Sequence, residues 1–491
     1  MRASRVGQIE KRGGDLESGG SLALRTALPA TAWTWGAAFL AAGLLSLLLS
    51  AQAQAVPSYA RQTGLPCTTC HTAFPQLTPF GRDFKMSGYT LGDAEQVLPP
   101  VAVMLQGAPG WTHTQKSQPS SDIPNSSFNS NNNLSLNQVS FFYAGKLFGP
   151  YAKKLLGDDV GGALDHVGTF IQGTWDGVEH AWAIDNAEVR VANRGSLCGK
   201  NVIYGGYVNN NPTMQDPWNS TPAFGFPFSG SGLAPTPDAA PLIAGGVEQQ
   251  VVGFGAYAFW NELLYVDVGA YTNLPHHLQS KLGVDPGGET KIDGLAPYWR
   301  VAIQKAWGAH SVELGTFGLS ADTFPGRDNS AGHDHMTDNA VDLQYQWLSG
   351  RHAVTLLANW IYEMQDLSAS QRLGLAWHSN LDLWTTSTTA SYLYDSTYGA
   401  DVQFFHTKGD RDMLLYGSRT GRPDSTGWIF QVNWLPFNKH GGPGFWPHSN
   451  VKFSLQYWLY NRFNGSTRNF DGAGRDAQDN NTIYLQAWFA F

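Results

Sequence analysis

Short segments in which apolar and polar residues alternate dominate this chain beyond about residue 100, and they limit the folds open to it. In residues 451–460, one face carries Val, Phe, Leu, Tyr and Leu, and the other carries Lys, Ser, Gln, Trp and Tyr. This period of two is typical of β-strands, because successive side chains point to opposite faces. From Leu136 onward we count about sixteen such segments, with an error of two. The sequence therefore predicts an all-β fold.

The composition favours a sheet that faces lipid. Charged residues make up 14% of the chain, compared with about 25% in typical domains. Trp and Tyr gather at segment ends, as in Tyr392–Tyr394. Hydrocarbon offers no hydrogen-bond partners, so a sheet that spans a membrane must close on itself. A soluble sandwich or propeller is the alternative, but its outward faces normally carry more charge. We predict a transmembrane antiparallel β-barrel of about 16 strands over residues 101–491.

Residues 1–55 resemble an export signal. Basic residues precede an apolar run that ends at Leu49, and the small residues of Ala51–Ala55 offer an A-x-A cleavage site. The alternative is an uncleaved membrane anchor, but the apolar run is short for a membrane span. We expect a cleaved signal peptide and a location in the bacterial outer membrane. The net charge of −8 argues against nucleic acid as a partner.

The run Cys-Thr-Thr-Cys-His at residues 67–71 predicts a covalently bound haem. Cys67 and Cys70 can form thioethers to the porphyrin, and His71 can then ligate the iron as its proximal ligand. A redox pair or half of a zinc site are the alternatives. Zinc would need more thiols, and Cys198 is the only other cysteine. We predict one haem c and expect Cys198 to be an inert structural thiol.

Residues 56–100 are too few to bury an ordinary cytochrome core, so this haem segment needs a host. Thr78 and Gly88 suit the start and the exit of a short helix. Arg82 and Lys85 on that helix are either partners of the haem propionates or ordinary surface charges. The segment is expected to lie inside the barrel.

The second iron ligand is less constrained. Met86 is close in sequence, and Met/His ligation would raise the redox potential. Met104, His113 and His166 are the alternatives, and Met86 also suits a core position.

Two long connections interrupt the strand pattern, at residues 111–133 and 210–248. Residues 211–228 have the character of an ordered insert, and such a loop can fold inward as a plug. His333 and His335 resemble metal ligands, but in a polar loop they are more often solvated.

The residues around the haem motif resemble those of the fused cytochrome–porins of bacterial outer membranes. The resemblance is carried by residues 55–64 and 74–85, and less specifically by residues 210–228 and the terminal Phe491. It implies a monohaem cytochrome c joined to a C-terminal barrel, with Cys67, Cys70 and His71 as the haem-binding residues.

The best-known members of that family are iron oxidases. The resemblance therefore implies transfer of electrons from extracellular Fe(II) to a periplasmic cytochrome or similar carrier, an Fe(II):cytochrome c oxidoreductase-type activity. The alternatives are a conduit for another donor or acceptor, and a diffusion porin with a haem-bearing plug. In this interpretation the domains are 1–55 (signal), 56–100 (cytochrome) and 101–491 (barrel).

Overall fold

The computed structural model describes residues 57–92, 100–148, 151–221, 228–283 and 290–491, so the expected signal peptide lies outside the described residues. The described part contains one sheet of eighteen antiparallel segments. These are β1 Val101–Thr114, β2 Asn133–Ser135, β3 Gln138–Lys146, β4 Val167–Asp176, β5 Ala181–Leu197, β6 Lys200–Asn209, β7 Val251–Trp260, β8 Leu264–Asn273, β9 Thr290–Ile292, β10 Ala296–Trp307, β11 His310–Pro325, β12 Asp334–Ser349, β13 His352–Asp366, β14 Asn380–Tyr394, β15 Tyr398–Gly409, β16 Ser425–Trp434, β17 Asn450–Arg462 and β18 Thr482–Ala490.

The sheet closes into a barrel because β1 pairs with β18, with Trp111 opposite Leu485. Segments β2 and β3 both pair with β1, and β9 and β10 both lie between β8 and β11. The eighteen segments therefore form sixteen strands around the barrel, which confirms the predicted fold. The count from Leu136 onward left out β1 and included one later segment too many. In β1 the alternation is broken by a bulge between Gln106 and Gly110.

The two faces of the wall differ as the alternation predicts. On β17, Ser454 and Gln456 are buried toward the lumen, whereas Leu455 between them is 46% exposed on the outside. The same outward exposure recurs around the barrel, at Phe254, Val268, Ile303, Leu314 and Val432. An apolar outer wall on a closed sheet suits contact with lipid. Among the described residues, no helix is both long and apolar enough to span a membrane.

The two ends of the barrel carry different connections. At one end, which we call the short-turn end, strands are joined at residues 198–199, 261–263, 308–309, 350–351 and 395–397. The other end, the long-loop end, carries residues 115–132, 210–250, 367–379 and 463–481. Short turns face the periplasm in bacterial barrels. Two longer connections at the short-turn end, 147–166 and 435–449, are exceptions.

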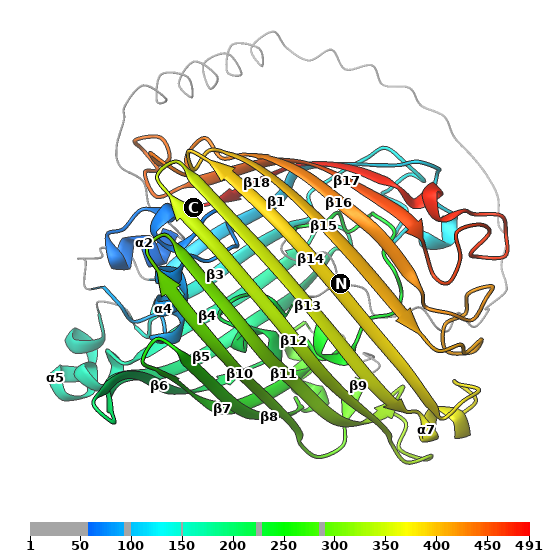
Figure 1. Cartoon of the computed structure of the whole chain (residues 1–491), viewed down its shortest axis with the longest axis horizontal. Helices are drawn as coiled ribbons and strands as arrows, with labels where there is room; N and C mark the ends of the chain where they lie inside the picture. Colours follow the sequence, from blue (N-terminus) through cyan, green and yellow to red (C-terminus); the bar gives the residue numbers. More distant parts are fainter. Residues whose placement is uncertain (1–56, 93–99, 149–150, 222–227, 284–289) are drawn as a thin grey trace, which may run out of the picture.

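Helical segments lie at both ends and in the lumen. In Figure 1, α2, α4 and α5 gather at one end of the barrel and α7 lies at the other. The α-helices are α2 Pro57–Thr63, α3 Cys67–Cys70, α4 Pro79–Met86, α5 Ala152–Leu164, α6 His276–Lys281 and α7 Ser368–Arg372, and the 3-10 helices are η1 Ser120–Asp122, η3 Pro212–Gln215, η4 Leu242–Ala244 and η5 Ala477–Asn480.

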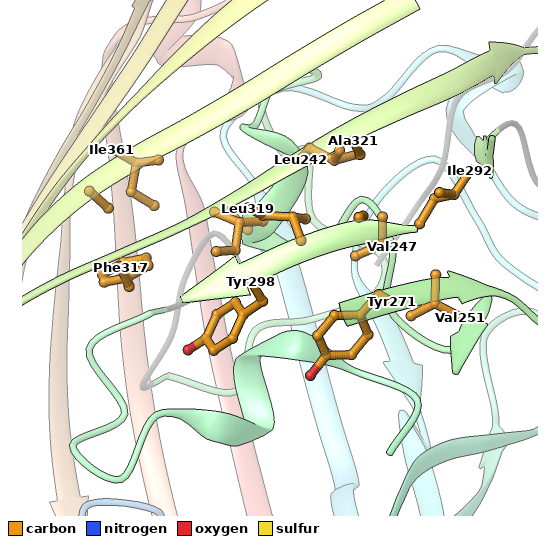
Figure 2. Close-up of a cluster of buried hydrophobic side chains, with 14 residues drawn as sticks. Leu242, Val247, Val251, Tyr271, Ile292, Tyr298, Phe317, Leu319, Ala321 and Ile361 are labelled. Atoms are coloured by element: carbon orange, nitrogen blue, oxygen red, sulfur yellow. The ribbon is translucent and has the colours of Figure 1, made fainter. Parts of the chain in front are cut away.

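The described residues of the connection between β6 and β7, 210–221 and 228–250, fold into the lumen and contribute to an apolar cluster with the wall. Leu242 and Val247 of this insert pack with Tyr271, Tyr298 and Phe317 from the barrel wall (Figure 2). The predicted ordered insert is therefore found inside the barrel, on the side of the long-loop end.

Candidate functional site

The haem motif forms one helical turn, α3, with its thiols on one side. Cys67 and Cys70 are 2% and 7% exposed, and three positions of helix bring them onto the same face. The His71 backbone is extended, and its N–H donates to the carbonyl of Cys67 at 2.9 Å. His71 therefore follows the second cysteine as the C-cap residue of the turn.

Helix α4 packs tightly against this turn. Thr78 begins the helix as predicted, since its hydroxyl oxygen accepts a hydrogen bond from the Gly81 N–H at 3.1 Å. The Thr78 N–H also donates to the carbonyl of Cys70 at 2.9 Å. A Cβ atom at Gly81 would collide with that same carbonyl. Glycine is needed here because the two backbones meet.

The donor set fits a c-type haem. Both thiols are free, and the Nδ1 atom of His71 is buried with no hydrogen-bond partner among the described residues. Burial raises the pKa of the Cys67 thiol to about 12 and that of Cys70 to about 11. Protonated, buried thiols do not suit a reactive redox pair. Burial lowers the pKa of His71 to about 4, which leaves the imidazole neutral, as a metal ligand must be.

Zinc fits less well. Within the described ranges, no three His, Cys, Asp or Glu side chains are grouped so that they could hold a metal ion. A haem brings four pyrrole nitrogens of its own, so it needs only the axial ligands from the protein.

Arg82 joins the haem segment to one half of the wall. Its guanidinium is 1% exposed and donates to the side-chain oxygens of Gln344 at 2.6 Å and Gln346 at 2.8 Å on β12. Gln346 in turn donates to the carbonyl of Leu77 at 2.9 Å. Arg82 is thus neither a surface charge nor free for a propionate.

Strands β14 and β17 and the connection between β16 and β17 hold the same segment. Gln76 donates to Ser391 on β14 at 2.7 Å, Asn438 donates to the carbonyl of Thr72 at 3.0 Å, and Lys452 on β17 donates to that of Phe74 at 2.9 Å. A hollow of about 10 Å³ remains between the segment and this wall, which is room for one water at most.

The insert meets the haem segment in the middle of the lumen. Lys85 of α4 donates to the backbone carbonyl of Asp216 at 2.9 Å. The Asp216 carboxylate accepts the backbone N–H groups of Trp218 at 2.8 Å and Ser220 at 2.6 Å. It also pairs with Arg300 of β10 at 3.3 Å.

Arg300 is the centre of a buried ionic cluster. Besides Asp216 it pairs with Glu313 at 3.2 Å and with Asp342, both from the wall. All four side chains are at most 1% exposed. Such charges are stable only when they are paired, so the insert is fixed to the wall by this cluster.

Met86 lies in a different environment from the motif. It is 1% exposed and packs with Trp218 of the insert and with Tyr207 and Tyr257 of the wall. That cluster contains none of Cys67, Cys70 or His71, although Met86 shares helix α4 with residues that touch them. Its role as distal ligand stays a prediction.

The remaining candidates are distant or exposed. His113 bonds Asn132 at 2.8 Å near the long-loop end, and His166 is exposed. His333 and His335 are about half exposed and pair with Asp293 and Asp322 respectively. Cys198 is exposed in a tight turn rather than buried as a structural thiol.

The wall residues that hold the motif were not singled out in the sequence. Gln344, Gln346 and Ser391 are ordinary polar members of alternating strands. Lys452 is the one exception, because it is the only charged residue in the strand pattern of residues 451–460.

No family model and no curated protein matches this chain. Solved structures with a similar fold include a loop-deletion mutant of OmpT, an outer membrane protein of Vibrio cholerae (TM-score 0.38, 9% identity, 80% of this chain and 98% of that one). They also include an anion-selective porin from Comamonas acidovorans (0.41, 10%, 79% and 98%) and the outer membrane channel DcaP of Acinetobacter baumannii (0.40, 11%, 80% and 96%). These likenesses concern the fold alone.

The chain is a porin-like β-barrel of the outer membrane, as predicted. A closed antiparallel sheet of sixteen strands with an apolar outer wall and short turns at one end has the features of this class.

Proposed function

We propose that this protein is an outer-membrane electron-transfer protein that carries one haem c on Cys67 and Cys70, with His71 as proximal ligand. The observation that carries this proposal is the enclosure of the motif: hydrogen bonds with β12, β14 and β17 fasten residues 74–77, just after the motif, inside a closed barrel. A haem bound there supplies one-electron chemistry. The chain's own residues hold it, keep water from it and close the lumen around it.

The position of the motif suits delivery of electrons to the periplasm. Its wall contacts Gln346 and Ser391 lie three residues from strand ends at the short-turn end, or about 10 Å along the strand. The donor proposed is extracellular Fe(II), and the acceptor is a periplasmic cytochrome or similar carrier. Both follow from the resemblance to the fused cytochrome–porins.

A diffusion porin is the second candidate, and the size of the barrel favours it. Barrels of sixteen strands in porins enclose an aqueous channel. Against free diffusion, the described lumen is filled from both ends: the haem segment bonds to the wall near the short-turn end, and the insert bonds to it further out.

Sealed liposomes that contain the purified protein test both candidates. Cytochrome c is enclosed inside, and Fe(II) is added outside at acidic pH. We expect reduction of the enclosed cytochrome without swelling in small sugars. Swelling without reduction would favour the porin, and a colourless protein would refute the electron-transfer proposal.

A further inference from the structure

Lys452 is a buried lysine beside the haem motif. It points from β17 into the lumen and is 3% exposed. Its Nζ atom donates to the carbonyl of Phe74 at 2.9 Å, and lies 5.1 Å from the centre of the Phe74 ring and 4.4 Å from that of Trp488. The first residue of this strand is also tied to the segment: Asn450 donates to Asn438 at 3.0 Å, and Asn438 donates to the carbonyl of Thr72 at 3.0 Å.

The charge of Lys452 is not balanced by a close carboxylate. No Asp or Glu in the described ranges lies within 4.0 Å of its Nζ atom. The carboxylate of Asp401, two strands away on β15, attracts this ammonium electrostatically over a longer distance. That carboxylate itself accepts hydrogen bonds from Gln431 at 2.8 Å and from Asn433. An ammonium has three donors, and one of them has an acceptor in the described protein. Aromatic faces offset part of the cost of burial, but a buried charge normally has an opposite charge beside it.

Two other buried cations of the lumen have carboxylate partners: Arg300 has three, and Arg190 pairs with Glu188 at 2.6 Å. Arg82 has only neutral acceptors, but both of its terminal nitrogens are taken, by Gln344 and Gln346 on one side and Ser311 on the other. Residues 57–82, which contain the motif, have no Asp or Glu, and Asp83, which follows them, pairs with Arg194. The described residues around the motif therefore offer Lys452 no carboxylate at ion-pair distance.

We propose that Lys452 binds a propionate carboxylate of the haem. This inference rests on the haem of the proposed function. It assigns to Lys452 the role of orienting the propionate side of that haem. The sequence offered Arg82 and Lys85 for this role. Arg82 is held by β12, and Lys85 donates to the insert at Asp216, where the carboxylates of Asp216 and Glu188 already attract it. A cation at the propionate also stabilises the reduced haem, which carries one negative charge more than the oxidised form.

Redox titration of the purified holoprotein tests this assignment with Lys452→Met and Lys452→Arg. In Lys452→Met we expect the haem to stay attached and the midpoint potential to fall, so that the ratio of reduced to oxidised haem at the wild-type midpoint drops about tenfold, equivalent to about 59 mV. The propionate should then titrate near neutral pH, because its counter-charge is gone. The matched control is Lys408→Met, since Lys408 also lies over an aromatic ring, 5.0 Å from the centre of Trp384, but is exposed.

Lys452→Arg keeps the positive charge, so it still tests the inference if the neutral variant Lys452→Met does not fold. We expect its potential to stay near the wild-type value, and its propionate bending band in resonance Raman spectra to shift, because a guanidinium binds a carboxylate through two N–H groups. An unchanged band, or a coloured Lys452→Met protein with wild-type potential and pH dependence, would overturn the inference. A colourless wild-type protein would instead refute the haem itself.

Discussion

Cys67 and Cys70 are buried in the lumen, and no strand depends on them. The barrel is closed by the ladder between β1 and β18, which lies outside the haem segment. The thiols and the sheet should therefore be separable by mutation.

Cys67→Ser should remove the covalent haem and leave a folded barrel. The serine hydroxyl cannot form the thioether, whereas the hydrogen bonds of the sheet are untouched. Haem absorbance per mole of protein and the heat-dependent shift in gel mobility measure the two effects. Cys198→Ser is the control, because that thiol is exposed in a turn, and it should keep full absorbance. Loss of the barrel along with the haem would show that the haem is required for folding.

Gly81→Ala should reduce haem attachment even though it leaves every ligand in place. Its Cβ atom would collide with the backbone of Cys70, and overpacking of this kind typically costs about 1–3 kcal/mol. The readout is haem content at equal barrel yield. Gly162→Ala is the control, because nothing lies within 4 Å of a Cβ there. Equal haem content in both variants would contradict the close packing of α3 and α4.

Among the elements, the insert of residues 210–250 depends most on a single residue. Asp216 caps its turn through the N–H groups of Trp218 and Ser220, and pairs with Arg300 of the wall. One substitution should therefore loosen the contact between insert and wall.

Asp216→Ala should open the lumen to small solutes. The change leaves the backbone donors of the turn without their acceptor and takes one carboxylate from Arg300, and breaking a buried pair typically costs about 3–5 kcal/mol. Liposome swelling in small sugars should accelerate relative to the wild type. Asp328→Ala, in an exposed loop, should swell at the wild-type rate. If both variants stay closed, the insert is held mainly by the apolar cluster around Leu242.

At the level of elements, the sequence predicted the strands well and their contacts poorly. Alternation identified β17 with the correct faces, because burial on one side and lipid on the other dictate it. The predicted barrel began at residue 101, but the count of segments began only at Leu136 and so left out β1, where a bulge interrupts the pattern. The motif and the cap at Thr78 could be predicted since they are local. The bonds from Arg82 to Gln344 and Gln346 could not, because they join residues more than 260 positions apart.

As a whole molecule, the barrel holds two segments in its lumen, which meet where Lys85 donates to Asp216. The haem segment bonds to the wall near the short-turn end, and the insert bonds to it from the middle of the lumen outward. The haem segment precedes β1 in the chain, whereas the insert connects β6 with β7.

Deletion of residues 57–92 should leave a closed barrel without haem. The strands pair among themselves, and β1 begins after the deleted segment. We expect retained heat-dependent mobility and faster solute leakage, because Gln344, Ser391 and Lys452 would then face water. A deletion protein that fails to resist detergent at room temperature would show that the segment is part of the folding core.

The seam between the first and last strands has a consequence for the order of events in the cell. Residues 57–92, which precede β1, are bonded to the inner face of a barrel that is completed only when β18 pairs with β1, and one of those bonds joins Phe74 to β17, the last strand but one. A cofactor joined to Cys67 must consequently be installed while the chain is still open. For the proposed haem, attachment should therefore precede membrane insertion, and a cell that lacks the attachment machinery should accumulate barrels that can no longer receive haem.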